Sequence, residues 1–286
     1  MVEMIQPVQR GTQLLSDIDN TQVQPGQVAI WWLGQSGYAI KTASTLVYID
    51  LYLSESLSEQ TSGGVEHIRM TEAPLRGNEI TNAGWVFSSH GHPDHFDGAT
   101  LLPLMTASPN AKLILPASEA ESAVKAGIAH ERQLPMRGND TLQVGGLTVH
   151  ALPSAHPNFD HKAESGYPYL GYVLQGDGVT LYHTGDTIRY VGLAEKVKPY
   201  NVDVAFLPIN GAVGQKVEIN TAPNMDAQTA VEFGQQIGAK LVIPHHYDLF
   251  TYNTVDVNDF TGLAASAGLP YRVLHPGEKF VWSRGQ

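Results

Sequence analysis

The sequence contains no cysteine among its 286 residues. Disulfides, thiolate metal sites and a cysteine nucleophile are therefore excluded, and any metal must be bound by His, Asp or Glu. Basic residues are also few, because 17 Lys and Arg stand against 28 Asp and Glu, which gives a formal net charge of -11. A protein that holds nucleic acid through many phosphate contacts needs a basic surface, so we expect no nucleic-acid partner.

Long apolar runs are missing as well. No segment approaches the ~18 apolar residues of a membrane span, and residues 1–20 lack the apolar core of a signal peptide. We therefore expect no membrane association and a cytoplasmic protein. Hydrophobic residues make up 42% of the chain and charged residues only 16%, which predicts a sizeable core rather than extensive disorder.

Short runs rich in β-branched and aromatic residues, separated by Gly, Pro, Asn and Asp, predict strands along much of the chain. Residues 28–34, 38–41 and 45–50 follow one another too closely for helical crossovers, which predicts an antiparallel meander. Residues 51–84 form the longest stretch without a predicted element, and long loops of this kind often face a substrate.

Helical patterns follow the first strands. Residues 118–127 predict a helix in which Ser118 is the N-cap and Gly127 ends the last turn, and residues 224–239 predict an amphipathic helix. Strands followed by strands mixed with helices predict an α/β fold, with sheets packed between helices in one domain that spans residues 1–286.

The densest group of metal-binding residue types is the stretch SSHGHPDHFD, residues 88–97, which follows a predicted buried strand. In an extended segment alternate side chains point the same way, so His90, His92 and Asp94 can converge. His95 adds a fourth group. Four groups from one short stretch are more than one side of a single tetrahedral metal site can take, which indicates two adjacent metals. The alternative is a solvated loop.

Further candidate ligands favour the metal site over the solvated loop. His156, Asp186 and the pair His245 and His246 each follow a separate predicted strand. Rigid scaffolds present functional loops at strand ends, so the four stretches together indicate one site. Neighbours on a strand point to opposite faces, and we expect only one of His245 and His246 to bind.

The pattern H-x-H-x-D-H, then a later His, an Asp in a Gly-Asp pair and a last His after a strand, resembles the metallo-β-lactamase fold family over nearly the whole chain. The stretches QPGQVAIWWLGQSGYAIK, LYHTGDT, VDVAFLPING and AKLVIPHHYDLF are similar to the branch that contains the bacterial L-ascorbate-6-phosphate lactonases and related predicted hydrolases. The resemblance implies an αββα sandwich, with two mixed sheets packed between helices.

The resemblance also implies seven metal ligands in two sites: His90, His92 and His156 in one, Asp94, His95 and His246 in the other, and Asp186 as a bridge. The branch reads I-P-x-H at the last strand, which places the ligand at His246 and leaves His245 as a packing or supporting residue. Asp50 matches the first motif of the family, and we expect its carboxylate to orient the N–H of a ligand.

The resemblance implies that the protein is a metal-dependent hydrolase. It would bind two divalent ions, zinc or manganese, that hold a hydroxide between them. The expected substrate is a small molecule, anionic if phosphorylated: a lactone or a phosphorylated sugar acid lactone. We expect Asp94 to be catalytic and to handle the proton of the attacking water. A phosphodiesterase acting on a small phosphodiester or nucleotide stays open, as does a non-catalytic metal-binding or di-iron oxidoreductase domain. The family relationship also allows a homo-oligomer.

The sequence gives the least information about which residues contact the substrate. A phosphate would need a cation, for which Arg189 is the first candidate and Arg69 and Arg76 are others. Asn158, Asn210 and Tyr247 lie beside predicted ligands or strand ends and are further candidates. The remaining histidines lack supporting spacing, so we expect a buried, hydrogen-bonded His183 and structural or exposed roles for the others: His67, His130, His150, His161 and His275.

Overall fold

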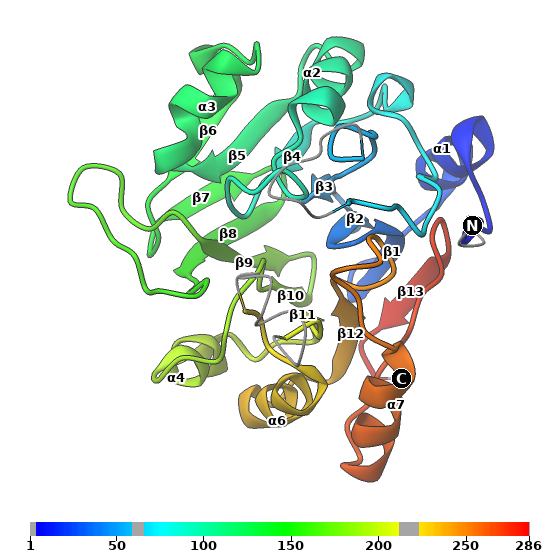
Figure 1. Ribbon diagram of the computed structural model, residues 1–286, viewed down its shortest axis with the longest axis vertical. Coiled ribbons are helices and arrows are strands. Elements are labelled where there is room, and N and C mark those ends of the chain that lie inside the picture. The colour runs from blue at the N-terminus through cyan, green and yellow to red at the C-terminus, as the bar shows by residue number, and fades with distance from the viewer. Residues whose placement is uncertain (1–3, 59–65, 212–222, 286) are drawn as a thin grey trace.

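Two β-sheets face each other in the middle of the molecule, and helices cover the outer side of each (Figure 1). The computed structural model describes residues 4–58, 66–211 and 223–285. This arrangement is the αββα sandwich with two mixed sheets that the sequence predicted. Within the described residues no helix is long and apolar enough to cross a membrane.

The first sheet has seven strands in the order β13-β1-β2-β3-β4-β5-β6. Their bounds are β1 Gln27–Gly34, β2 Gly37–Lys41, β3 Leu46–Ile49, β4 Trp85–Phe87, β5 Lys112–Pro116, β6 Gln133–Met136 and β13 Lys279–Ser283. β1, β2 and β3 pair antiparallel, as their close spacing predicted, and β3 to β6 pair parallel. The carboxyl ends of β3 and β4 therefore lie side by side.

The second sheet has six strands in the order β12-β11-β10-β9-β8-β7. Their bounds are β7 Thr141–Val144, β8 Leu147–Pro153, β9 Leu170–Gly176, β10 Val179–His183, β11 Val204–Pro208 and β12 Leu241–His245. β10, β11 and β12 are parallel, while β9 is antiparallel to both β8 and β10. β8, β10, β11 and β12 consequently run in one direction and end at the same edge.

The helices divide between the two outer faces. On the first sheet lie α1 Gly11–Asn20, α2 Gly98–Ala107 and α3 Ala120–Lys125, and on the second lie α4 Leu193–Val197, α6 Ala227–Ile237 and α7 Val257–Ser266 (Figure 1). Short 3-10 turns complete the described elements: η1 Gly77–Glu79, η2 Ala117–Glu119, η3 His130–Arg132 and η4 Lys198–Tyr200.

The strand β1 shows how the layers are held together. Ile30 and Trp32 face the core between the sheets, while Trp31 and Leu33 pack on the other face with residues of the outer helices. Both faces of the strand are buried, which explains its uninterrupted apolar sequence. Each such side chain contributes roughly 1.5–3 kcal/mol relative to its exposed state.

One predicted helix start is wrong. The backbone forms the turn η2 before α3, so α3 begins at Ala120, and Ser118 does not cap it. Ser118 instead donates through its hydroxyl to Glu119 Oε1 at 3.3 Å. The predicted end is confirmed, because α3 stops at Lys125 and Gly127 follows with a φ of +90°, a backbone region that glycine adopts without strain.

Candidate metal centre

Four strand ends bring the predicted ligands to one edge of the sandwich. Asp50 follows β3 and the loop 88–97 follows β4, and Asp50 N donates to the carbonyl of Phe87 at 2.9 Å. From the facing sheet, His156, Asp186 and His246 follow β8, β10 and β12. The parallel directions of these strands thus produce the convergence that the sequence pattern indicated.

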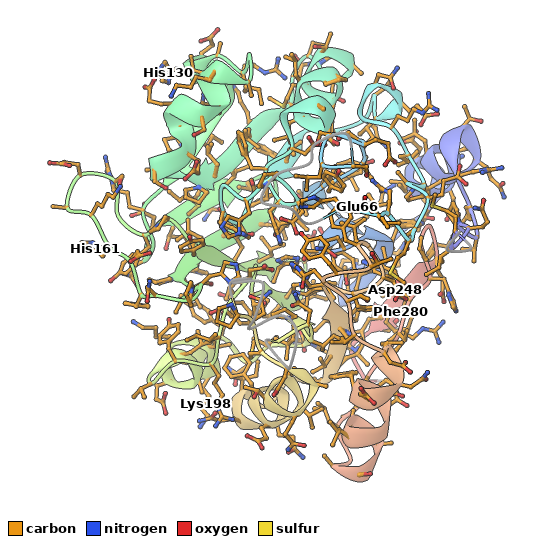
Figure 2. The ribbon with its side chains drawn as sticks, in the orientation of Figure 1. Glu66, His130, His161, Lys198, Asp248 and Phe280 are labelled. Atoms are coloured by element: carbon orange, nitrogen blue, oxygen red, sulfur yellow. The ribbon has the colours of Figure 1, made fainter. Side chains whose placement is uncertain are left out.

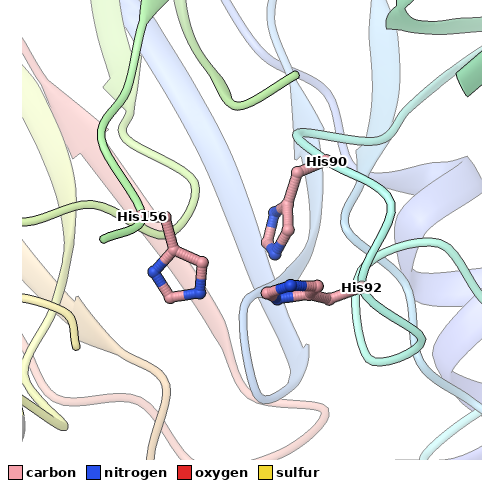
Figure 3. Close-up of side chains that lie close together, drawn as sticks. All are labelled: His90, His92 and His156. Atoms are coloured by element: carbon pink, nitrogen blue, oxygen red, sulfur yellow. The ribbon is translucent and has the colours of Figure 1, made fainter. Parts of the chain in front are cut away.

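The ligand atoms form three overlapping groups, each with its atoms within 4.8 Å of one another: His90, His92 and His156; His90, His95 and Asp186; Asp94, His95 and His246. The first group is shown in Figure 3, where the rings of His90 and His92 from one loop point toward the ring of His156 from the other sheet. The first and third groups are the two sets that the family resemblance implied.

Asp186 lies between those two sets. Its Oδ2 is 3.6 Å from His156 Nε2 in the first set and 3.0 Å from His246 Nε2 in the second. Its Oδ1 is 3.3 Å from His95 Nε2. A carboxylate in this position has an oxygen within reach of each set, which is the placement required of a bridging group.

Hydrogen bonds to Nδ1 fix how three of the rings face the centre. Asp50 Oδ2 accepts from His95 Nδ1 at 2.8 Å, and the carbonyl of Pro223 accepts from His156 Nδ1 at 3.1 Å. His90 Nδ1 lies 3.0 Å from Ser89 Oγ. When Nδ1 is held in this way, Nε2 is directed inward with its lone pair available, the form in which imidazole binds metal.

Three buried polar atoms at the centre lack a hydrogen-bond partner among the described residues: His90 Nε2, His95 Nε2 and Asp186 Oδ1. Buried polar groups are almost always satisfied in folded proteins, so three orphans in one place call for an explanation. A divalent cation supplies it, since imidazole nitrogen and carboxylate oxygen are its usual ligands. The side chains present fit divalent metal.

Asp50 is fully buried and makes three contacts that anchor the loop. Besides His95, it accepts from Ser89 N at 2.7 Å and from Ser89 Oγ at 2.6 Å. The carboxylate therefore ties the loop 88–97 to the end of β3 while it holds the ring of His95. This placement is the one expected of an acid that orients a ligand.

His245 and His246 point to different environments. β12 ends at His245, whose ring is fully buried, lies 2.9 Å from Ser36 Oγ through Nδ1 and stacks on His183 at 5.0 Å. His246 has a φ of +65°, which turns its ring toward Asp94 and Asp186. The change in backbone conformation, rather than strand alternation, separates the two side chains.

The backbone is strained around the centre. Gln35, Asp50 and His246 all adopt positive φ values, of +51°, +49° and +65°. A non-glycine residue in this region costs of order 1–3 kcal/mol, and such residues cluster at functional sites. Gly185 shows the same crowding, because a Cβ there would lie 2.6 Å from Ser89 Cβ, so only glycine can precede Asp186.

The histidines of the centre differ in the direction in which their pKa is shifted. Burial lowers the pKa of His156 to about 4, with Asp186 opposing it, and burial with the neighbouring His95 lowers the pKa of His90 well below its usual value. Burial would also lower the pKa of His246, but Asp186 and Asp94 outweigh it and raise the pKa to about 9. At neutral pH His90 and His156 are therefore neutral, and His246 keeps a proton that a metal would displace.

The carboxylates stay ionised. Burial alone would raise the pKa of Asp186, yet the charges of His246 and His95 hold the pKa well below its usual value. The same opposition, with His95 as the main partner, keeps the pKa of Asp94 well below its usual value. Two anionic ligands thus face the centre, which favours a dication.

A cavity of about 260 Å³ opens over the centre. Its described lining residues are Leu57, His67, His92, Pro93, Asp94, His156, Asp186, Asn224, His246, Tyr252 and Asn253. A larger depression of about 550 Å³, lined in part by Arg76, contains none of the grouped ligands. Leu57 and His67 belong to the long segment 51–84 that we expected to face a substrate, although residues 59–65 lie outside the described part.

None of the four predicted substrate contacts, Arg189, Asn158, Asn210 and Tyr247, lies among the described lining residues of the cavity. Arg189 is exposed, and its guanidinium forms an ion pair with Glu232 at 2.8 Å beside a separate depression. Asn158 is exposed, with its carbonyl accepting from His156 N at 3.1 Å. Tyr247 is buried and stacks on Trp32 at 4.9 Å. Their proximity to ligands in the sequence does not place their side chains at the site.

Arg69 has a structural role instead of a substrate contact. Its guanidinium is buried and donates to the carbonyls of Thr71 at 2.6 Å and Ser54 at 2.6 Å, so it joins two parts of the segment 51–84. His183 is buried and hydrogen-bonded to the Ser36 carbonyl at 3.0 Å, as predicted.

Four of the remaining histidines are placed as expected. His130 and His161 lie at the periphery of the molecule (Figure 2) and are exposed, as is His275. His150 is half-buried and lies 3.0 Å from Thr141 Oγ1 through Nδ1. None of them belongs to the ligand groups found among the described residues.

The structure adds residues that the sequence analysis did not connect with the centre. Gln35 Nε2 donates to Asp94 Oδ2 at 2.8 Å, and Asn224 Nδ2 donates to Asp186 Oδ2 at 2.9 Å. Asn210, a predicted substrate contact, is instead linked to Asn224 at 2.9 Å. His67, expected to be structural or exposed, is half-buried and lines the cavity. No spacing signal marks these positions, because each reaches the centre from a loop.

Comparison with known proteins agrees with this geometry. The β-lactamase superfamily domain profile matches residues 60–247. The chain is 24% identical to UlaG of Escherichia coli, a probable L-ascorbate-6-phosphate lactonase, over 95% of this chain and 86% of that protein.

Two solved structures share the fold. Igni18, a metallo hydrolase from Ignicoccus hospitalis, superposes with a TM-score of 0.67 at 22% identity and covers 90% of this chain and 99% of its own. CmlA, a di-iron β-hydroxylase from Streptomyces venezuelae, superposes with a TM-score of 0.63 at 14% identity, over 92% of this chain and 55% of its own. The fold therefore accommodates more than one kind of metal chemistry.

The family match, the two-sheet architecture and the His/Asp groups lead to one assignment. The groups indicate divalent metal, and the family and the site together support a metal-dependent hydrolase. The chain belongs to the β-lactamase superfamily domain family and has the metallo-β-lactamase fold.

Proposed function

We propose that the protein hydrolyses a small lactone with the help of two divalent metal ions. The observation that carries the proposal is the set of orphaned atoms His90 Nε2, His95 Nε2 and Asp186 Oδ1, grouped with ligands that line a cavity. Binding two ions would satisfy all three and would expose the metals to a ligand in the cavity. Zinc or manganese suits a set of five imidazoles and two carboxylates.

Each ion would have its own protein ligands. His90, His92 and His156 would hold one, Asp94, His95 and His246 the other, and Asp186 would contact both. When bound, a pair of such ions supplies a hydroxide at neutral pH and polarises a carbonyl oxygen. Such a hydroxide would add to the lactone carbonyl carbon, the ring C–O bond would break, and the leaving oxygen would take up a proton.

Asp94 is the side chain best placed to control the attacking water. It is partly exposed at the cavity, and Gln35 Nε2 fixes its Oδ2 at 2.8 Å. The low pKa of Asp94 means that its carboxylate accepts a hydrogen bond from the water without retaining the proton. This orients a lone pair of the water toward the substrate and leaves the proton free to reach the leaving oxygen.

The cavity favours a small and uncharged substrate. Its volume of about 260 Å³ is below the range of drug-sized pockets, roughly 300–1,000 Å³. No Lys or Arg occurs among its described lining residues, so this wall offers no cation for a phosphate. The kinship with a probable lactonase supports a lactone, and the lining favours an unphosphorylated one over a phosphorylated sugar acid lactone.

An activity panel tests the proposal. Purified protein loaded with zinc or manganese would be assayed on lactones, phosphorylated lactones, phosphodiesters and phosphomonoesters. We expect the highest kcat/KM on an unphosphorylated lactone, lost in His92→Ala and Asp186→Ala. Preference for a phosphodiester, oxygen-dependent turnover with iron, or no turnover at all would favour the phosphodiesterase, di-iron or non-catalytic alternative instead.

A further inference from the structure

A row of three buried carboxamides connects the metal centre with the cavity wall. Asn224 Nδ2 donates to Asp186 Oδ2 and to Asn210 Oδ1, both at 2.9 Å. Asn210 Nδ2 donates in turn to Asn253 Oδ1 at 2.9 Å. The residues Asn224, Asn210 and Asn253 are 6%, 3% and 8% exposed, and Asn224 and Asn253 line the cavity.

The orientation of each amide follows from the anion at one end of the row. An ionised carboxylate only accepts hydrogen bonds, so Asn224 must turn its NH2 group toward Asp186. Asn210 meets the same NH2 group and must present its oxygen, which directs its own NH2 group to Asn253. Asn253 must then present its oxygen to Asn210, and its NH2 group is left for the opposite side.

The NH2 group of Asn253 has no partner among the contacts of the described residues, although the residue lines the cavity. Asn224 Oδ1 is likewise buried without a partner in the same wall. A site recognises a polar ligand through unpaired polar atoms of this kind. A ligand that cannot hydrogen-bond to them leaves them unpaired when it binds, and this lowers its affinity.

We propose that Asn253 binds the substrate by donating from Nδ2 to one of its uncharged oxygen atoms, and that Asn210 and Asn224 hold Asn253 in the orientation that makes this possible. The proposal rests on the lactonase function proposed above, since the oxygen concerned belongs to the ester group or a hydroxyl of the lactone. Asn253 is then a specificity-determining residue, and Asn210 and Asn224 are positioning residues.

The isosteric change Asn253→Asp tests this directly. An Asp keeps the oxygen that accepts from Asn210 but replaces the cavity-facing donor with an anionic acceptor. Asn258→Asp is the matched control, because Asn258 is exposed near the start of α7 and the charge change is the same. Asn253→Ala removes the donor without adding charge and serves if the Asp variant does not fold.

The probes are glucono-δ-lactone for turnover and D-gluconate, its hydroxy acid product, for binding by calorimetry on zinc-loaded protein. We expect Asn253→Asp to lose about 10- to 100-fold in kcat/KM, mainly through KM, and a similar factor in gluconate affinity. The metal content and Tm should match wild type, and Asn258→Asp should stay within about 2-fold of it.

Each outcome bears on the role of Asn253, on the lactonase function, or on both. Wild-type turnover that is unchanged in folded Asn253→Asp and Asn253→Ala overturns the role of Asn253 and leaves the lactonase function standing. Gluconate binding that is lost in these variants, without turnover in wild type, supports the carboxamide row and counts against the lactonase function. If wild type neither binds gluconate nor hydrolyses the lactone, the role of Asn253 is overturned together with the function.

Discussion

Replacing Asp50 with Asn tests how the centre orients His95. The fully buried carboxylate accepts from His95 Nδ1 at 2.8 Å with one oxygen and from Ser89 N at 2.7 Å with the other. An Asn side chain has only one acceptor, so its NH2 group must face either His95 Nδ1–H or Ser89 N–H. If it faces the ring, His95 must adopt the tautomer whose Nε2 carries the proton and cannot bind metal.

The expected loss can be estimated from these contacts. A hydrogen bond to a charged group contributes about 1.5–3 kcal/mol, and removing the group that orients a metal ligand typically costs about 10- to 100-fold in metal affinity. We expect this loss at the ion held by Asp94, His95 and His246, while the ion held by the other set keeps its affinity. Turnover should fall by a similar factor at limiting metal.

Competition of zinc against a chromophoric chelator measures the two affinities separately. Asp177→Asn is the matched control, because Asp177 Oδ2 also accepts three hydrogen bonds, from Thr42 Oγ1 at 2.7 Å, Ser44 N at 2.8 Å and Ser44 Oγ at 2.6 Å. That variant should lose stability without losing zinc. A folded Asp50→Asn protein that binds both ions as tightly as wild type would refute the reasoning about His95.

Three further predictions concern metal removal, protons and the surface. Chelation should lower the Tm by about 8 °C, since a ligand at 1,000 times its Kd stabilises by about 4 kcal/mol; an unchanged Tm would count against bound metal. Because the pKa of His246 is raised to about 9, its proton stabilises the metal-free fold at lower pH and is lost as the pH rises through 9. Because Asp186, Asp94 and Asp50 raise the pKa of His95 as well, zinc binding at pH 7.5 should release about one proton more from wild type than from His246→Gln, seen by calorimetry in buffers of different ionisation enthalpy. Arg189→Gln should leave kcat/KM within about 2-fold, because the exposed guanidinium pairs with Glu232 and is absent from the described lining of the cavity; a 10-fold loss would mean that Arg189 reaches the substrate.

The sequence was most informative where a metal-binding residue type directly follows a predicted strand. The ligand positions follow strands that run in the same direction within each sheet and end at one edge of the sandwich, so a strand pattern with His or Asp at its end predicts both the element and the convergence of the ends. The loop 88–97, His156, Asp186 and His246 were found in this way. Asp50 was found from the family motif, and its contact with His95 agrees with the role expected of it.

The residues around the centre were harder to predict for a physical reason. Gln35 contacts Asp94 from a turn with positive φ, Asn224 contacts Asp186 from a loop, and Asn253 lines the cavity from another loop. Conversely, Arg189 is three positions from Asp186 in the sequence, yet the chain turns its side chain outward to Glu232. Sequence distance constrains side-chain direction only within regular elements, and the cavity wall is built from loops.

The number of metal ions per chain tests the central claim most directly. Protein purified with zinc or manganese in excess, freed of loosely bound ions and analysed by mass spectrometry should contain two ions per chain. Asp94→Asn combined with His246→Gln should retain one, because the set of His90, His92 and His156 is left intact. No bound metal in folded wild-type protein, or two ions in the double variant, would contradict the account.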